Sequence, residues 1–171
     1  MLTLFSVEHA SSHHKKASAS LQLRSITPEE FQSMLDVTKE VVGPESAESW
    51  RFLLQGLWWS GLRLGEALSL TWHPSETLYL DFESGKYPLF RISGSAEKGG
   101  KDRLLPMAPE FAKFVKPMRQ KTGFVFCPGR VWNGRTKNYQ RNKQWISTVG
   151  CRIGQNADCL LYTSPSPRDR G

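Results

Sequence analysis

The chain has 171 residues, 39% of them hydrophobic, with 23 Lys and Arg against 16 Asp and Glu. This length is expected to form one soluble domain with a core of its own, and no apolar run approaches the ~18 residues that predict a transmembrane helix. The N-terminus lacks the basic and then apolar order of a signal peptide. Three cysteines, Cys127, Cys151 and Cys159, show no metal-binding spacing, which predicts a reducing, cytoplasmic setting.

The positive charge is concentrated in the second half of the chain. Residues 1–97 carry 8 Lys and Arg against 12 Asp and Glu, a balance of −4, whereas residues 98–158 carry 13 against 3, a balance of +10. A concentrated basic surface is typical of proteins that bind polyanions such as nucleic acid. A basic face that is simply solvated explains the charge equally well, so the charge alone leaves both interpretations open.

Helices are predicted in the first part of the ordered chain. Residues 1–24 are rich in Ser, His and Lys and lack periodicity, which predicts a disordered lead-in or linker. A first helix is expected to begin after the capping residue Thr27 and to end near Val42. A second helix from about Glu45 contains "WRFLLQGLWW", which is apolar nearly all round and is expected to be central and buried. A third, short helix is predicted over 64–72.

A period of two then indicates strands. Three strands are predicted at 77–82, 89–93 and 103–107. Between the last two, Gly99-Gly100 is a two-residue hairpin signal, because both positions accept a positive φ. Such a turn would place Lys98 and Lys101 across from one another at the hairpin tip.

The rest of the chain returns to helical spacing. A helix is predicted over 108–118, with Pro117 kinking or ending it, and a short buried segment at 123–126. A basic amphipathic helix is predicted over 136–154. The residues expected to face inward are Phe111, Phe114, Val115 and Met118 in the first of these helices, and Trp145, Ile146, Val149 and Ile153 in the second. The predicted fold is therefore mainly α with a small antiparallel three-stranded β-sheet, an α+β class.

The stretch "SGLRLGEALSLTW" at 60–72 is the first motif with chemical meaning. Arg63 follows a glycine turn at the end of the buried helix, and Glu66 comes three residues later. A surface ion pair at this spacing is common. However, the flanking residues are apolar, so Arg63 is expected to project from a rigid core, which suits a phosphate clamp. A guanidinium offers a planar fork of donors to two phosphate oxygens.

The second motif is "EKGGKDRLLPM" at 97–107, which carries Lys98 and Lys101. Alone it is a weak signal, because lysines at turns are common. In this order and spacing, the two motifs together resemble the catalytic domain of the tyrosine recombinases, the phage integrase family. That family has an "ITPEE" segment, a "GLR…E" segment and a "KG.K.R..P" hairpin, which here read "ITPEEF", "GLRLGEAL" and "KGGKDRLLPM". The resemblance extends to roughly Asn156.

The resemblance implies roles for particular residues. Arg63 matches the first catalytic arginine and Lys98 the hairpin lysine, while Glu66 and Lys101 match supporting positions. The family breaks and rejoins DNA by metal-free phosphoryl transfer, so no cofactor and no metal are expected. The implied partners are double-stranded DNA and, in the intact enzyme, further recombinase protomers that form a tetramer on the DNA; a membrane partner is not expected. The implied location is the cytoplasm, at the nucleoid. The residues expected to contact DNA are Lys101, Arg103, Lys137, Arg141 and Lys143.

The sequence departs from the family pattern at its end. The family continues with a His-x-x-Arg box and a tyrosine nucleophile, whereas no His occurs after His73. Tyr162 is rejected as the nucleophile, because Pro165 and Pro167 prevent the helix that would carry it. "CLLYTSPSPRD" also resembles a translated sequencing adaptor, so residues 159–171 are interpreted as a non-native tail.

The sequence is accordingly interpreted as a lead-in at 1–24 and a partial tyrosine recombinase catalytic domain at 25–158, which is expected to be inactive alone. Two alternatives remain open at this point. One is a non-catalytic nucleic-acid-binding module that uses the basic segment 98–158, and the other is an enzyme similar to type IB topoisomerases.

Overall fold

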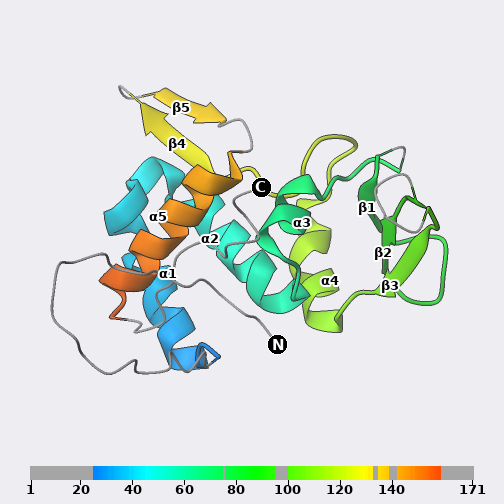
Figure 1. Cartoon of the computed structure of the whole chain (residues 1–171), viewed down its shortest axis with the longest axis horizontal. Coiled ribbons are helices and arrows are strands. Elements are labelled where there is room, and N and C mark those ends of the chain that lie inside the picture. Colours follow the sequence, from blue (N-terminus) through cyan, green and yellow to red (C-terminus); the bar gives the residue numbers. More distant parts are fainter. Residues whose placement is uncertain (1–24, 75, 95–99, 133–134, 139–141, 159–171) are drawn as a thin grey trace, which may run out of the picture.

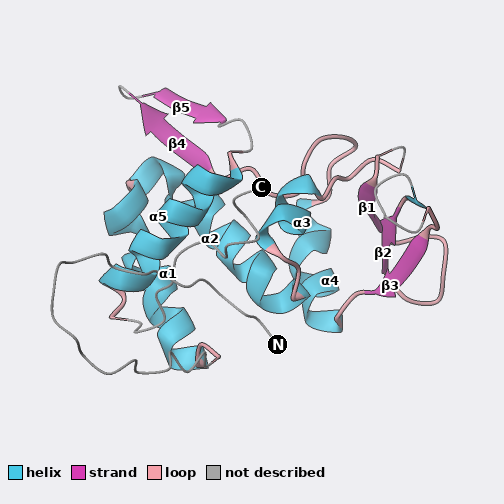
Figure 2. Cartoon of the chain, in the orientation of Figure 1, coloured by secondary structure: helices cyan, strands magenta, loops and turns pink. Residues whose placement is uncertain are grey.

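The computed structural model describes residues 25–74, 76–94, 100–132, 135–138 and 142–158. In these residues, three helices are followed by three antiparallel strands, a helix, a two-stranded ribbon and a last helix, and the predicted α+β class is confirmed (Figures 1 and 2). The three-stranded sheet lies at one end of the molecule and α1 and α5 at the other, with α2 between them (Figure 1). The helices are α1 (Pro28–Val42), α2 (Pro44–Ser60), α3 (Leu64–Ser69), α4 (Pro109–Val115) and α5 (Lys143–Asn156), and the strands are β1 (Leu78–Asp81), β2 (Leu89–Ile92), β3 (Arg103–Pro106), β4 (Gly129–Trp132) and β5 (Arg135–Asn138).

Helix α1 begins and ends where local signals predict. The Thr27 hydroxyl accepts a hydrogen bond from the backbone N–H of Glu30 at 3.2 Å, and the Glu30 carboxylate accepts one from the backbone N–H of Thr27 at 2.9 Å. This reciprocal capping box satisfies two N–H groups that a helix start leaves without partners. The helix ends at Gly43, whose φ of +85° suits glycine. The predicted bounds of the first helix are confirmed.

Helix α2 is the centre of the core, as its apolar sequence predicts. Trp50 and Leu53 are both 1% exposed, and the helix packs against α1, α3, α4 and β4. The Trp50 indole N–H donates to the carbonyl of Gly129 at 2.9 Å, which satisfies the one polar atom of a buried aromatic side chain. Helix α2 is therefore held in place from several sides. The turn at Gly61, which ends the helix, is anchored at that side as well.

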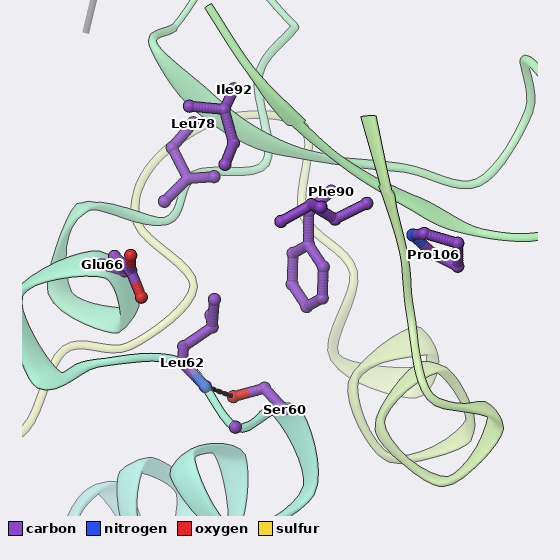
Figure 3. Close-up of a pocket in the computed structure, with 9 residues that line it drawn as sticks. Ser60, Leu62, Glu66, Leu78, Phe90, Ile92 and Pro106 are labelled. Atoms are coloured by element: carbon purple, nitrogen blue, oxygen red, sulfur yellow. Dashed lines mark hydrogen bonds between the residues drawn. The ribbon is translucent and has the colours of Figure 1, made fainter. Parts of the chain in front are cut away.

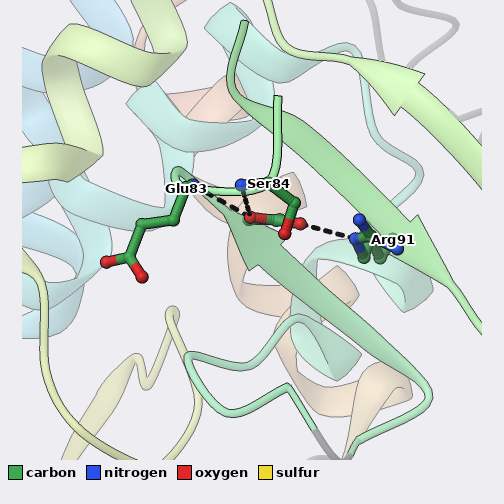
Figure 4. A network of polar contacts seen from close by, with 4 residues as sticks. Glu83, Ser84 and Arg91 are labelled. Atoms are coloured by element: carbon green, nitrogen blue, oxygen red, sulfur yellow. Dashed lines mark hydrogen bonds and ion pairs between the residues drawn. The ribbon is translucent and has the colours of Figure 1, made fainter. Parts of the chain in front are cut away.

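The three-stranded sheet has the order β1-β2-β3 and is antiparallel throughout. The buried carboxylate of Asp81 links β1 to the neighbouring strand and to the turn after it (Figure 4). It accepts hydrogen bonds from the backbone N–H groups of Glu83 and Ser84, both at 2.9 Å, and from Nε of Arg91 on the neighbouring strand. These bonds join strand β2 to the turn that follows β1.

The connection between β2 and β3 differs from the predicted two-residue turn. Ile92 lies opposite Arg103 in the ladder, so the connection runs from 93 to 102. A turn centred on Gly99-Gly100 would require a different register, with Lys98 opposite Lys101. The prediction of a tight hairpin is therefore wrong, and Lys98 itself lies outside the described residues.

The segments that follow confirm some predictions and correct others. Helix α3 ends at Ser69 rather than near 72, because 70–72 is extended backbone that bonds to β1 and to 123–125. Helix α4 ends before Pro117, as expected, and a 3₁₀ turn follows at Lys116–Met118. Phe111 and Val115 are fully buried, but Met118 is 49% exposed, so its predicted inward orientation is wrong.

The predicted helix over 136–154 is only partly correct. Arg135–Asn138 forms strand β5, which pairs with β4 as an antiparallel ribbon, and helix α5 begins at Lys143. Within α5, Ile146, Val149 and Ile153 are buried as predicted, and Trp145 packs edge-on against the ring of Trp50 with centroids 5.6 Å apart.

Candidate phosphate-binding site

Arg63 lies on a turn whose backbone is fixed on both sides. Gly61 ends α2 in the left-handed conformation, with φ +66°, and the N–H of Leu62 donates to the Ser60 hydroxyl at 3.1 Å. The Leu62 side chain packs against the hydrophobic core. Arg63 then caps α3 in an extended conformation, and its side chain is 90% exposed. The turn thus presents a guanidinium to solvent from an anchored backbone.

Glu66 orders the backbone of this turn more than it neutralises the guanidinium. One carboxylate oxygen accepts the backbone N–H of Arg63 at 2.7 Å, while the other lies 3.9 Å from Nη1 of Arg63. An exposed ion pair of this length contributes about 0–1 kcal/mol. The guanidinium therefore keeps its planar edge available for an anion, as a phosphate clamp requires.

A small pocket of about 200 Å³ lies between the Arg63 turn and the three-stranded sheet (Figure 3). Among the described residues that line it, Ser60 and Glu66 have polar side chains and most of the others are apolar. The lining residues are Ser60, Gly61, Leu62, Glu66, Leu78, Phe90, Ile92, Leu105 and Pro106. The pocket therefore brings the Arg63 turn and the β2–β3 hairpin to its two sides.

Two of the predicted cations lie at the base of that hairpin. Arg103 is the first residue of β3 and lies opposite Ile92, which lines the pocket. The exposed Lys101 is two residues before Arg103. The two arms of the connection approach closely here. The Gly94 N–H donates to the Asp102 carboxylate at 2.7 Å, and a Cβ on Gly94 would lie 2.6 Å from the Gly100 carbonyl oxygen. This narrow stem fixes the position of the backbone at Lys101.

Lys143 lies close to the Arg63 turn, a contact that the sequence does not predict. Its Cδ and Cε atoms both lie 3.9 Å from the position that a Cβ would take on Gly65, two residues after Arg63. Lys143 is exposed and is the first residue of α5. Of the other predicted DNA contacts, Lys137 lies on β5 opposite Arg130, and Arg141 lies outside the described residues, as do Tyr162 and the rest of 159–171.

Among the described residues, then, Arg63, Glu66 and Lys143 lie around one turn, with Lys101 and Arg103 across the pocket from it. Comparison with protein-family models, with curated proteins and with solved structures gave no match. No helix in the described part of the chain is both long and apolar enough to cross a membrane. The same residues contain no group of three His, Cys, Asp or Glu side chains arranged to hold a metal ion.

Proposed function

We propose that this chain belongs to a cytoplasmic site-specific DNA recombinase of the tyrosine recombinase type, in which Arg63 binds a DNA phosphodiester. The observation that carries the proposal is the geometry of the Arg63 turn. An exposed guanidinium projects from a backbone fixed by Gly61, by the core contact of Leu62 and by the Glu66 carboxylate. Preorganised donors of this kind stabilise charge that develops on a phosphate.

The proposed chemistry is phosphoryl transfer in two steps. A tyrosine hydroxyl attacks a phosphodiester, forms a 3′-phosphotyrosyl bond and releases a 5′-hydroxyl. A 5′-hydroxyl from another strand then reverses the step, so the energy of the bond is conserved without ATP. In this scheme Arg63 binds the non-bridging oxygens, and Lys98 donates the proton that the leaving 5′-oxygen needs. No metal or cofactor takes part.

Residues 1–171 supply part of this machinery. They contain Arg63 and Lys98 but no His-x-x-Arg sequence, and Tyr162 is not the proposed nucleophile. Strand cleavage is therefore proposed for a polypeptide that also contains those groups, acting as a tetramer on DNA. For the chain itself the proposed activity is DNA binding, through Arg63 and the basic residues Lys101, Arg103, Lys137, Arg141 and Lys143.

A binding assay on this chain tests the proposal. Fluorescence anisotropy with a labelled DNA duplex of mixed sequence is compared for the unchanged chain and for Arg63→Ala. Loss of a charge-assisted hydrogen bond is worth about 1.5–3 kcal/mol, so the dissociation constant should rise by roughly tenfold or more. The salt dependence should also become shallower, because one fewer phosphate is neutralised. Lys39→Ala is the control, since Lys39 is an exposed cation in the last turn of α1.

The result also separates this proposal from its main alternative. If Arg63→Ala binds the duplex as tightly as the unchanged chain, Arg63 does not bind a phosphate and the recombinase proposal fails. A non-catalytic module that binds nucleic acid through 98–158 would then be the better account, because the balance of +10 charges in that segment does not include Arg63.

A further inference from the structure

We infer that Lys143 is a second cation of the Arg63 site and that the two side chains bind one and the same DNA phosphate. The inference rests on the proposed function and adds to it a residue that the recombinase motifs do not contain. Lys143 would then differ from a general contact to the DNA backbone, because its effect would depend on Arg63.

The first support is the path of the Lys143 side chain. Its Cδ and Cε atoms lie 3.9 Å from a Cβ position on Gly65, and the amine nitrogen is one bond of about 1.5 Å further on. Arg63 is two residues before Gly65, at the N-cap of the same helix, α3. Since a phosphate presents several oxygens, the planar guanidinium and the compact ammonium can each bind a different one.

The second support is that the backbone of Lys143 is fixed. The Asn142 side chain caps α5 by accepting the Trp145 N–H at 3.1 Å, and the Asn142 carbonyl accepts the Ile146 N–H at 3.0 Å. Ile146 is 2% exposed. The start of α5 is therefore tied to the core, and α5 also packs directly on α3. Both cations thus project from anchored backbones.

The third support is the position of Lys143 at the N-terminal end of a helix. Lys143 occupies the first position of α5, and the first turn of that helix contains no acidic residue. A cation at the N-terminal end of a helix is unfavourable, because the helix dipole is positive there. Arg63 adds further positive charge nearby, and Glu66 is only loosely paired with it. Local rules are often broken in this way at functional sites, and a bound phosphate would interact favourably with both cations and with the N-terminal end of α5.

A double-mutant cycle on duplex binding tests the inference. Anisotropy with the same labelled duplex is measured for Arg63→Ala, for Lys143→Gln and for the double variant. Each single change should raise the dissociation constant by roughly tenfold or more. Because both cations bind one phosphate, the double variant should lose clearly less than the product of the two single effects.

Matched variants keep the result interpretable. Lys143→Arg should restore most of the affinity, and Lys113→Gln, which removes an exposed cation from the last turn of α4, should leave the Arg63 coupling unchanged. Gly65→Leu changes no charge but places atoms in the path of the Lys143 side chain, so it should weaken binding much as Lys143→Gln does. Gly65→Ala adds only a Cβ at an ordinary contact distance of 3.9 Å and should not weaken it. Thermal unfolding of each variant checks that it folds.

Each outcome decides between the two claims. If Arg63→Ala weakens binding while Lys143→Gln does not, or if the two effects simply multiply, the shared phosphate is disproved and the proposed function stands. If neither change weakens binding, both claims fail. Both claims are supported if the double variant loses less affinity than the product of the two single effects and if Lys143→Arg restores most of the affinity.

Discussion

Replacement of Gly56 by alanine should destabilise the protein, although helix propensity alone predicts the opposite. Gly56 lies within α2, where Ala is favoured over Gly by about 1 kcal/mol. In the structure, a Cβ on Gly56 would overlap Cζ and Cε1 of the Phe126 ring. Phe126 is 1% exposed, and the ring of Phe52 lies against it with centroids 5.1 Å apart. The Phe126 ring therefore has no free space to move into.

The balance of these two effects sets the expected magnitude. Overpacking a well-packed core costs about 1–3 kcal/mol, and a contact this short with a confined ring belongs at the upper end. Subtracting about 1 kcal/mol for helix propensity leaves a net loss of about 2 kcal/mol in the free energy of unfolding. Urea denaturation followed by tryptophan fluorescence measures this change directly.

Two further variants identify the cause. Gly150→Ala makes the same substitution in α5, where nothing lies within 4 Å of the added Cβ, so it should stabilise the protein by about 0.5–1 kcal/mol. Gly56→Ala combined with Phe126→Leu should recover part of the lost stability, because the smaller side chain makes room. A Gly56→Ala variant as stable as the unchanged chain would refute the packing of α2 on 123–126.

Three other changes give further tests. Gly61→Ala places a side chain at φ +66°, which should cost about 1–2 kcal/mol of stability and, by moving Arg63, should also weaken duplex binding. Although burial raises the pKa of Asp81, its hydrogen bonds to Ser84, Glu83 and Arg91 more than offset that effect and hold the pKa well below its ordinary value. The stability that Asp81 contributes should therefore be present at neutral pH and be lost as the pH falls below about 4, and Asp81→Asn should flatten that part of a pH series of urea midpoints. Thr27→Ala removes the acceptor of the 3.2 Å capping bond of α1 and should lower the free energy of unfolding by about 1 kcal/mol, again measured in urea.

The elements that could be predicted from the sequence are those specified by local signals. Helix α1 begins at a capping residue and ends at a glycine followed by a proline, and both boundaries were predicted from those residues. The segment "WRFLLQGLWW" of α2 likewise predicts its burial, because a helix that is hydrophobic nearly all round needs partners on most sides. For such elements, neighbouring residues in the sequence contain the necessary information.

The β4–β5 ribbon differs from the helix predicted over 136–154, although the sequence contains a signal for the ribbon. Asn133-Gly134, a dipeptide typical of two-residue hairpins, lies between the paired residues Trp132 and Arg135. The basic residues of this segment instead favour one face of an amphipathic helix. A short strand and a helix start are hard to distinguish there, since only the pairing with β4 decides between them.

In the candidate site, too, some features are set by neighbouring residues and others by tertiary packing. The exposed position of Arg63 on an anchored turn can be predicted from the sequence, because the contacts that fix the turn lie within residues 60–66. The approach of Lys143 to Gly65 depends on how α5 packs on α3, and no local pattern encodes that contact. The register of β2 and β3 is also set by the core face of the sheet, so the glycine pair at 99–100 did not determine the turn.

The central claim is that this chain is part of a tyrosine recombinase, and one measurement tests it most directly. The gene is sequenced from genomic DNA without interruption across codon 158, the last codon of the partial catalytic domain that the sequence predicts. The account predicts an open reading frame that encodes a His-x-x-Arg box and then a tyrosine on a helix of its own. A reading frame that continues without either feature would contradict it.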